Sequence, residues 1–337
     1  MTIIQKGCAF LKILEPTIQR KIHKLFQFGF ITLSIQRIIS LNSNARCNLD
    51  NTKTAESKIY RLTKNERILK TLPYFLNHLG LVENGDLINV DFSDFHGRQV
   101  LMFAKQTEQG RAIPLYFDFI CYPLKEPGSQ NIFIIQSIIK FLELTNKRVK
   151  FVFDRGFALP HLIKFLAKNR LILYIRIKKA KIVETQGENI KALDLTKKDN
   201  RICVYDNNLR LVISDKPDSK NDEPWYIITN DKKSSRQEVL DIYYHRFEIE
   251  ELFRDAKRIF GLEHIKLKKD LSFRIVLWFV ILGIWFVWYM QKFNFDLSRT
   301  RKRFKNGYHL SIIYHWLEWI QYEIRGRILS EIRFDTS

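Results

Sequence analysis

Cysteine is scarce in this sequence, and it does not occur in closely spaced pairs. The 337 residues include only four cysteines, Cys8, Cys47, Cys121 and Cys203. This scatter argues against a disulfide framework and against a cysteine zinc site, and it is typical of a protein from a reducing cytoplasm. No pair of histidines stands at metal-ligand spacing, so a histidine metal site is not expected either.

Long apolar runs are nearly absent as well. One unbroken run of 16 residues extends from Ile275 to Met290, with Arg274 and Lys292 close to its two ends. A membrane-spanning helix usually needs about 20 residues, so we expect a core helix packed behind a sheet, and no membrane partner. A membrane-associated protein is the alternative. No signal peptide is expected, because Lys12 and Glu15 interrupt the first short apolar run.

Acidic residues are few relative to basic ones. The chain has 56 Lys and Arg against 36 Asp and Glu, which gives a formal net charge of +20. So much positive charge on a folded chain predicts a polyanionic partner, of which nucleic acid is the usual kind. A membrane surface or a ribosome is the alternative. The hydrophobic content of 46%, with 26 Phe and 13 Tyr, supports a real core and excludes disorder.

Residues 1–84 are predicted to be helical and basic. The first 80 residues hold 13 Lys or Arg against 4 Asp or Glu. One basic cluster comprises Arg20, Lys21 and Lys24, and a second recurs at steps of three residues as Lys58, Arg61, Lys64 and Arg67. Such spacing would place the second cluster along one helical face, available to a phosphate backbone. A solvated helix face is the alternative.

From Gly85 the pattern changes to that of an α/β domain. The expected elements are strands at 86–92, 99–104 and 113–121, a helix at 129–144, a strand at 148–153, a helix at 157–169 and a strand at 171–177. Three strands followed by helix, strand, helix and strand is the order of an RNase H-like fold with a mixed sheet and flanking helices.

The stretch from Ser235 to Gly261 is predicted to be one helix with both ends marked. Ser235 and Glu238 form a capping-box pattern, and Gly261 is a natural stop. On a helix, four residues of this stretch fall within one stripe about 60° wide, and they are Tyr243, Arg246, Glu250 and Lys257. An apolar stripe beside them, Ile242, Ile249, Phe253, Ala256 and Phe260, predicts that one edge is buried. An ordinary surface helix is the alternative.

The spacing of the first four residues, Tyr-x2-Arg-x3-Glu-x6-Lys, matches the YREK signature of the insertion-sequence-four family of DDE transposases. The blocks VDFSD around Asp91 and DRGF after Asp154 are also similar to the family's short blocks around its two aspartates. The resemblance covers roughly residues 85 to 290. It implies a bacterial, nucleoid-associated enzyme that cuts at the ends of an insertion sequence and joins them to target DNA.

The resemblance carries the family's catalytic triad onto Asp91, Asp154 and Glu250. Their positions suit the predicted fold, because Asp91 lies near the end of the first strand and Asp154 closes the fourth. Asp94, three residues after Asp91, could take its place if a turn presented it. Such a triad would hold two Mg²⁺ ions, which Mn²⁺ can replace, with Asp91 bridging the ions. The paired ions would activate water and stabilise the leaving 3′ oxygen.

Further residues are predicted to bind DNA. Arg246, Lys257 and the hydroxyl of Tyr243 would bind phosphates beside the scissile bond. Arg155 is either a phosphate contact or a salt-bridge partner. Residues 179–234 match in position the β-rich insertion of the family, with a hairpin expected around Asp206 to Asn208 and a strand at 224–230. Trp225, with Phe247 as a second candidate, would stack on an extruded base, or else both are core aromatics.

The sequence thus predicts five segments. They are an N-terminal end-binding region (1–84), the first part of the catalytic core (85–178), the β-rich insertion (179–234), the second part of the core (235–295) and a basic helical C-terminal region (296–337). Double-stranded DNA, both the terminal inverted repeats and the target, is the expected partner, bound by a homodimer because two ends are joined. A nuclease without strand transfer and an inactive DNA-binding descendant are the alternatives.

Overall fold

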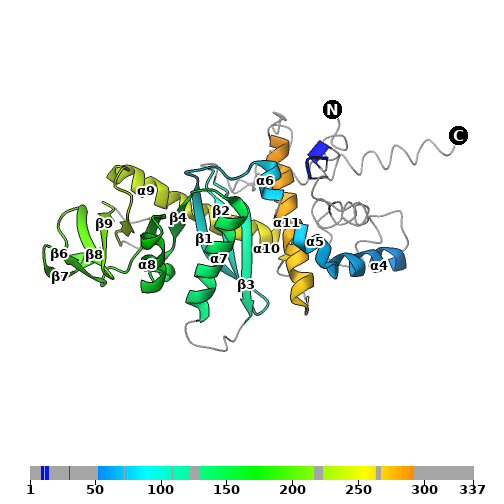
Figure 1. Cartoon of the computed structure of the whole chain (residues 1–337), viewed down its shortest axis with the longest axis horizontal. Helices are drawn as coiled ribbons and strands as arrows, with labels where there is room; N and C mark the ends of the chain where they lie inside the picture. Colours follow the sequence, from blue (N-terminus) through cyan, green and yellow to red (C-terminus); the bar gives the residue numbers. More distant parts are fainter. Residues whose placement is uncertain are drawn as a thin grey trace, which may run out of the picture. The chain divides into compact units, whose positions relative to one another are not determined.

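The computed structural model of the chain describes residues 9–10, 12–14, 30, 52–71, 73, 75–107, 110–121, 129–215, 223–262 and 267–291 (Figure 1). It divides into two compact units, one formed by residues 81–252 and the other by residues 1–80 together with 253–337. The division falls inside one helix, α10 (Glu248–Arg258).

The unit of residues 81–252 is built on a mixed sheet. Its first five strands are β1 (Leu87–Phe95), β2 (Arg98–Lys105), β3 (Ile113–Cys121), β4 (Lys150–Phe153) and β5 (Ile172–Arg176). They lie in the order β3-β2-β1-β4-β5. Strands β1, β2 and β3 pair antiparallel, whereas β4 is parallel to both β1 and β5. This mixed arrangement is compatible with the RNase H-like fold expected from the order of the elements.

Strand β1 is longer than the sequence predicted. The turn after it is formed by His96 and Gly97, which both have positive φ, at 48° and 78°. Two such residues in succession make the tight hairpin that suits two antiparallel strands. Asp94 therefore lies inside the strand, paired with Gln99, and not in a turn after Phe92.

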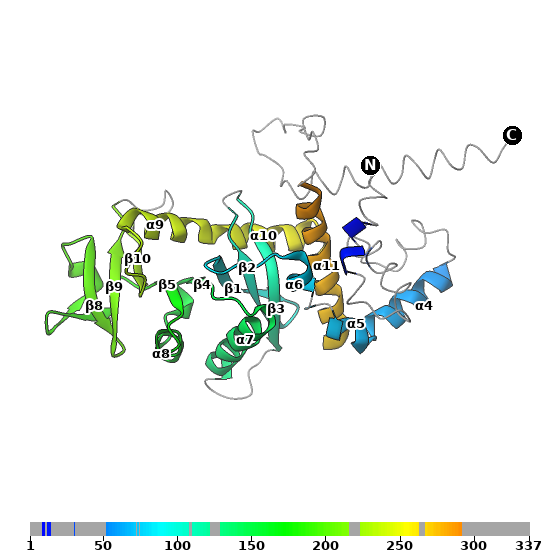
Figure 2. The same cartoon turned by 45° about the horizontal axis from the view of Figure 1, so that its top comes forward.

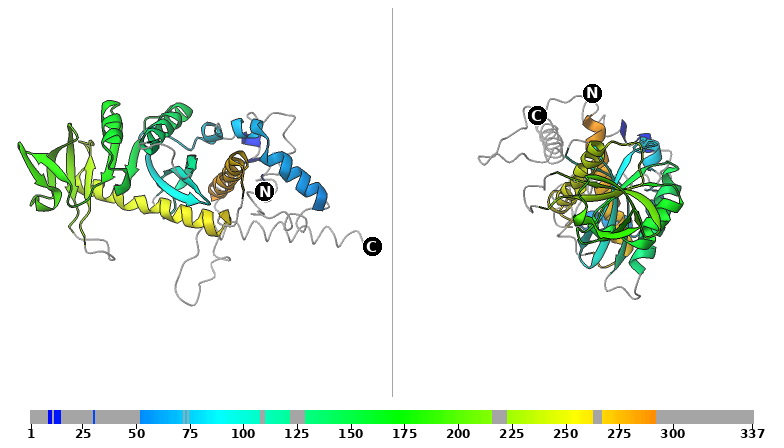
Figure 3. Two further views of the ribbon diagram at one scale, coloured as in Figure 1. Left: turned by 90° about the horizontal axis from the view of Figure 1, so that it is seen from below. Right: turned by 90° about the vertical axis from the view of Figure 1, so that its left-hand side faces the viewer.

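Helices cover both faces of this sheet (Figures 2 and 3). On one face lie α7 (Ser129–Thr145) and α8 (Pro160–Lys168), and the other carries α9 (Arg236–Tyr244), the 3-10 turn η7 (His245–Phe247) and the start of α10. The alternation of side chains along β1 explains the two layers. Phe92 stacks on Phe133 and Phe157 on the first face, whereas Asn89 bonds to the backbone of η7 on the second.

The sheet continues through residues 182–229 to ten strands in all among the described residues (Figure 2). The added strands are β6 (Ile182–Thr185), β7 (Glu188–Lys191), β8 (Asp199–Val204), β9 (Asn207–Ile213) and β10 (Tyr226–Thr229). The β8–β9 hairpin turns at Tyr205 and Asp206, both at positive φ, and not over 206–208 as predicted. The β6–β7 hairpin, which turns at Gln186 and Gly187, was not foreseen.

The predicted single helix from Ser235 to Gly261 is interrupted. The capping box is confirmed, since Ser235 N donates to Glu238 Oε2 at 2.6 Å and Glu238 N to Ser235 Oγ at 3.2 Å. The expected stop is confirmed as well, because Gly261 has φ of 66° and α10 ends at Arg258. Between them, η7 separates α9 from α10, so the residues of the stripe do not share one continuous helix.

The second unit contains α4 (Thr52–Thr63), α5 (Glu66–Thr71), α6 (Phe75–Leu79) and α11 (Asp270–Gln291). Among the described residues, α11 is the one helix long and apolar enough to cross a membrane, but 83% of its apolar window is buried inside the protein. It packs on α4 and α5, and Ser272 Oγ donates to Thr63 O at 3.0 Å. A core helix, as the sequence predicted, accounts for this burial.

The second basic cluster does not share one helical face. Because α4 ends at Thr63 and α5 begins at Glu66, Lys58 and Arg61 lie on a different helix from Arg67. The cluster Arg20, Lys21 and Lys24 and the whole segment 296–337 lie outside the described residues, so the end-binding and C-terminal regions stay predictions.

Candidate active site

The register of the parallel strands brings two of the predicted carboxylates together. Val90 of β1 is paired with Phe153 of β4, so the next residues along the two strands are Asp91 and Asp154. Asp154 directly follows β4 and occupies the N-cap position of the short 3-10 turn η5 (Arg155–Phe157), without a capping hydrogen bond from its side chain. The two carboxylates therefore stand at neighbouring positions of adjacent strands. Asp154 lies just beyond the end of β4, whereas Asp91 lies in the middle of β1, which continues to Phe95, and not near its end as the sequence predicted.

Glu250 joins them from the helical layer. It lies in the first turn of α10, one helical turn after Arg246. Burial raises the pKa of Asp91 to about 6, against the opposing charge of Arg246, and the charges of Asp154 and Glu250 add to the increase. The three carboxylates thus interact electrostatically, and concentrated negative charge of this kind is costly unless a cation neutralises it.

The guanidinium of Arg246 partly offsets this negative charge. Its side chain is 5% exposed, and Nη2 donates to Glu250 Oε1 at 2.5 Å while Nη1 donates to Asp91 Oδ2 at 3.4 Å. Burial by itself would lower the pKa of Arg246, but Tyr243, Asp154, Asp91 and Glu250 outweigh it and raise the pKa. Its Nε is buried with no hydrogen-bond partner, and its Cζ lies 4.6 Å from the centroid of the Phe247 ring and 5.8 Å from that of Tyr243. Carboxylates and aromatic rings together therefore hold the side chain.

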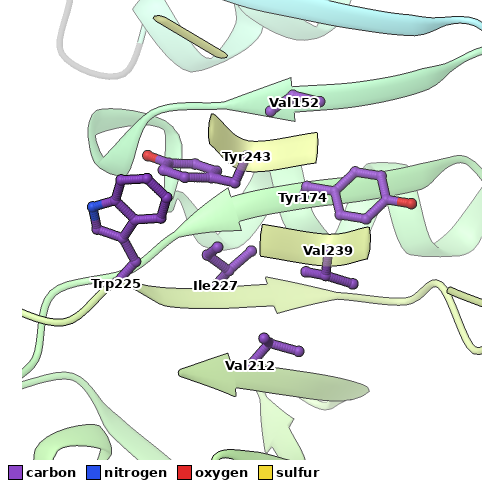
Figure 4. Close-up of a cluster of buried hydrophobic side chains, with 7 residues drawn as sticks. All are labelled: Val152, Tyr174, Val212, Trp225, Ile227, Val239 and Tyr243. Atoms are coloured by element: carbon purple, nitrogen blue, oxygen red, sulfur yellow. The ribbon is translucent and has the colours of Figure 1, made fainter. Parts of the chain in front are cut away.

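Tyr243, at the end of α9, contacts Asp154, the third carboxylate. It is fully buried, and its hydroxyl donates to Asp154 Oδ1 at 3.3 Å. Burial raises the pKa of Tyr243, so the phenol stays protonated and remains a donor. Its ring meets the edge of Trp225 at a centroid distance of 5.3 Å (Figure 4). A packed aromatic pair therefore orients the hydroxyl that bonds to Asp154.

Trp225 belongs to a buried cluster. It is 9% exposed and packs with six other core residues, namely Val152, Tyr174, Val212, Ile227, Val239 and Tyr243 (Figure 4). Phe247 is half-buried beside it. This arrangement matches the core-aromatic alternative for both residues, and stacking of either ring on a base stays a prediction.

The other predicted DNA-binding residues are placed separately. Arg155 is exposed on η5, next to Asp154. Lys257 is half-buried near the end of α10 and lies in the other unit of the chain. The triad, Tyr243 and Arg246 are therefore brought together in one unit, and the described structure does not add Lys257 to them.

The donor set fits a hard divalent cation in chemistry, because three carboxylates from three elements offer only oxygen ligands. The cage is not preassembled, however. Within the described ranges, no group of three or more His, Cys, Asp or Glu side chains is arranged to hold a metal ion. Arg246 bonds to two of the three carboxylates, so the guanidinium would have to release Glu250, whose side chain is 49% exposed.

Sequence reasoning missed several residues around the carboxylates. Arg176 ends β5, and because Phe153 is paired with Ile175, it stands beside Asp154 on the neighbouring strand. Asn89 is a polar residue inside an apolar strand, two positions before Asp91 and therefore on the same face. That alternation of Asn89 and Asp91 was visible in the sequence as a signal for a polar site on this face.

One comparison bears on this site. Residues 134–286 match the family model described as "Transposase DDE domain". The matched segment contains Asp154, Arg246 and Glu250 but starts after Asp91, and it covers less than half of the chain. No curated protein matches. The match supports a DDE transposase, an enzyme that acts on DNA.

Proposed function

We propose that this protein is a cut-and-paste transposase of the insertion-sequence-four type. It would cleave DNA at the terminal inverted repeats of an insertion sequence and transfer the freed 3′ ends into target DNA. The observation that supports the proposal is that Asp91 is adjacent to Asp154 across β1 and β4 and shares the guanidinium of Arg246 with Glu250, with two of the three carboxylates inside the matched segment. The YREK spacing from Tyr243 to Lys257 supports the specific family.

Asp91, Asp154 and Glu250 would hold two Mg²⁺ ions, which Mn²⁺ can replace. Bound there, the ions would supply the activation of water and the stabilisation of the leaving 3′ oxygen. The chain's own residues prepare the site. Tyr243 orients Asp154 through its hydroxyl, and Arg246 partly offsets the negative charge of Asp91 and Glu250 until the site is loaded.

The basic side chains around the carboxylates would also bind DNA. A phosphate placed at the carboxylates would come within reach of Arg246, which already contacts Asp91 and Glu250. Arg155 and Arg176 stand on the same edge, one after β4 and one ending β5, and would bind the neighbouring phosphates of the strand. Lys257 and the basic terminal segments would extend this contact along double-stranded DNA. Because two ends are joined, the active species is a homodimer on DNA in the bacterial nucleoid.

The test is cleavage of a labelled duplex that carries the terminal repeats flanking the gene, with Mg²⁺ present. We expect the wild type to nick at the repeat boundary and Glu250→Ala to bind the duplex without cutting it. Glu251→Ala is the matched control. Glu251 is the next residue on α10 but forms an ion pair with Arg111 at 3.0 Å, so its removal should leave cleavage intact.

Each alternative has its own outcome. Cleavage without joining to a second duplex would identify a nuclease that lacks strand transfer. Binding of the repeats by both wild type and Glu250→Ala, with no cleavage by either, would identify an inactive DNA-binding protein. If Glu250→Ala cut as well as the wild type, the assignment of the active site would be wrong.

A further inference from the structure

The interruption between α9 and α10 is held by two side-chain amides, that of Asn89 on β1 and that of Gln106 directly after β2. At a break in a helix, backbone carbonyls lose their helical partners and must find others. Asn89 Nδ2 donates to His245 O at 3.1 Å and to Arg246 O at 3.5 Å. Gln106 Nε2 donates to Ile242 O at 3.0 Å. The two amides thus bond to three carbonyls around η7.

The amides also bond to each other. Gln106 Nε2 donates to Asn89 Oδ1 at 2.7 Å, which leaves the Asn89 amide group oriented toward η7. Asn89 is completely buried, so its polar atoms have no access to solvent and depend on these partners. A buried amide pair of this kind specifies one geometry, because any shift of η7 along β1 would leave donors and acceptors unpaired.

The contact of these two amides with η7 lies next to the proposed catalytic residues, both along β1 and along the helical segment. Asn89 and Asp91 occupy alternate positions of one strand, so they are about 7 Å apart on the same face. Arg246 belongs to η7 itself, and Glu250 follows one turn later at the start of α10. The path from this contact is therefore short both to Asp91 along β1 and to Glu250 along the helix.

A second set of contacts holds the same segment. The buried carboxylate of Glu248, at the first position of α10, accepts hydrogen bonds from Thr107 N at 2.8 Å and Gly110 N at 3.2 Å. These residues follow Gln106 in the connection from β2 to β3. These hydrogen bonds join the β2–β3 connection to the start of α10, and Gln106 lies at the beginning of that connection.

We infer that Asn89 and Gln106 are positioning residues, which fix η7 on β1 so that Glu250 and Arg246 stand over Asp91. The inference rests on the proposed role of these carboxylates in binding the catalytic cations. It does not give either amide a contact with the cations or with DNA. Loss of such outer partners commonly weakens metal binding by about 10- to 100-fold.

The chain offers a matched control in Asn230. This amide makes the same kind of backbone bonds, accepting from Leu173 N at 3.0 Å and donating to Leu171 O at 2.8 Å. Its partners lie around the start of β5, whereas the carboxylates stand where β4 and β5 end. Asn230→Leu should therefore lower stability as Asn89→Leu does, without disturbing the carboxylates.

The experiment measures two properties of the full-length protein without DNA. The first is Mn²⁺ affinity, followed by electron paramagnetic resonance, and the second is hydrogen exchange of the peptide covering residues 242–252. For Asn89→Leu we expect about tenfold weaker Mn²⁺ binding and faster exchange in that peptide. Asn230→Leu should bind Mn²⁺ like the wild type. Gln106→Leu, at a half-buried position, should reproduce the Asn89→Leu effects if that variant fails to fold.

The effects of Asn89→Leu and Gln106→Leu should also be non-additive, because the two amides act as a pair. Wild-type Mn²⁺ affinity in both variants, or an equal loss in Asn230→Leu, would overturn the positioning role even if the wild type cleaves DNA. A wild type that binds Mn²⁺ without cleaving DNA would overturn only the proposed reaction. A wild type that binds no Mn²⁺ would overturn both.

Discussion

Replacement of Asp91 by Asn should stabilise the metal-free protein at neutral pH. The pKa of Asp91 is raised from 3.8 to about 6, chiefly by burial and further by Asp154 and Glu250. A folded-state pKa above the unfolded value means that the folded protein binds the proton more tightly. The resulting contribution to stability is complete below about pH 4 and is lost as the pH rises through about 6.

The size of the effect follows from the shift. Two pKa units at 1.36 kcal/mol each correspond to about 3 kcal/mol of unfolding free energy. The side chain of Asp91 is only 20% exposed, so solvent screening reduces this figure little. Asn has nearly the same shape, and its Oδ1 can still accept the hydrogen bond that Phe92 N donates to Asp91 at 2.8 Å. We therefore expect Asp91→Asn to be more stable by up to about 3 kcal/mol at about pH 7.5, and equal to the wild type at about pH 4.

Urea unfolding with a chelator at both pH values measures this difference, since the other titrating groups cancel between the two proteins. Asp94→Asn is the control, because Asp94 is exposed on the opposite face of β1 and its replacement should change little. Adding Mg²⁺ at 100 times its dissociation constant should stabilise the wild type by about 2.7 kcal/mol and leave Asp91→Asn unchanged. A variant less stable than the wild type at neutral pH, or an offset that does not change with pH, would refute the reasoning.

Two further predictions concern Arg246, which contacts Asp91, and Trp225, which packs against Tyr243. Arg246→Gln should destabilise the metal-free protein by about 3–5 kcal/mol at neutral pH, because Asp91 and Glu250 lose their buried partner. The same urea titration should show a smaller loss near pH 5, where Asp91 takes up its proton. An equal loss at both pH values would contradict the role of charge. Trp225→Ala should lower the free energy of unfolding by about 3–5 kcal/mol through the cavity left beside Tyr243, whereas Trp225→Phe should retain most of that free energy. A loss of DNA cleavage without a loss of stability would instead favour base stacking.

Much of the scaffold could be predicted from local patterns. The limits of β3 and the start of α7 follow the predicted 113–121 and 129–144 ranges, because β-branched runs and helical periodicity report local conformation directly. The capping box at Ser235 and the stop at Gly261 are also local, since each depends on neighbours a few residues away. The break at His245–Phe247 was not predictable in this way, because a continuous helix satisfies the same local pattern.

The amino-acid pattern alone indicates which side chains are chemically suited to bind cations. It placed Asp91 and Asp154 at strands and Glu250 beside Arg246 on a helix, and it marked Asp94 as a rival. Strand pairing and side-chain direction distinguish their positions. Alternation along β1 puts Asp94 on the other face, and pairing of Val90 with Phe153 sets Asp91 beside Asp154. The burial of Arg246, Tyr243 and Trp225 likewise depends on contacts between segments far apart in the chain. Burial is a property of packing, and the spacing of residues within one segment does not tell which side chains of another segment will cover them.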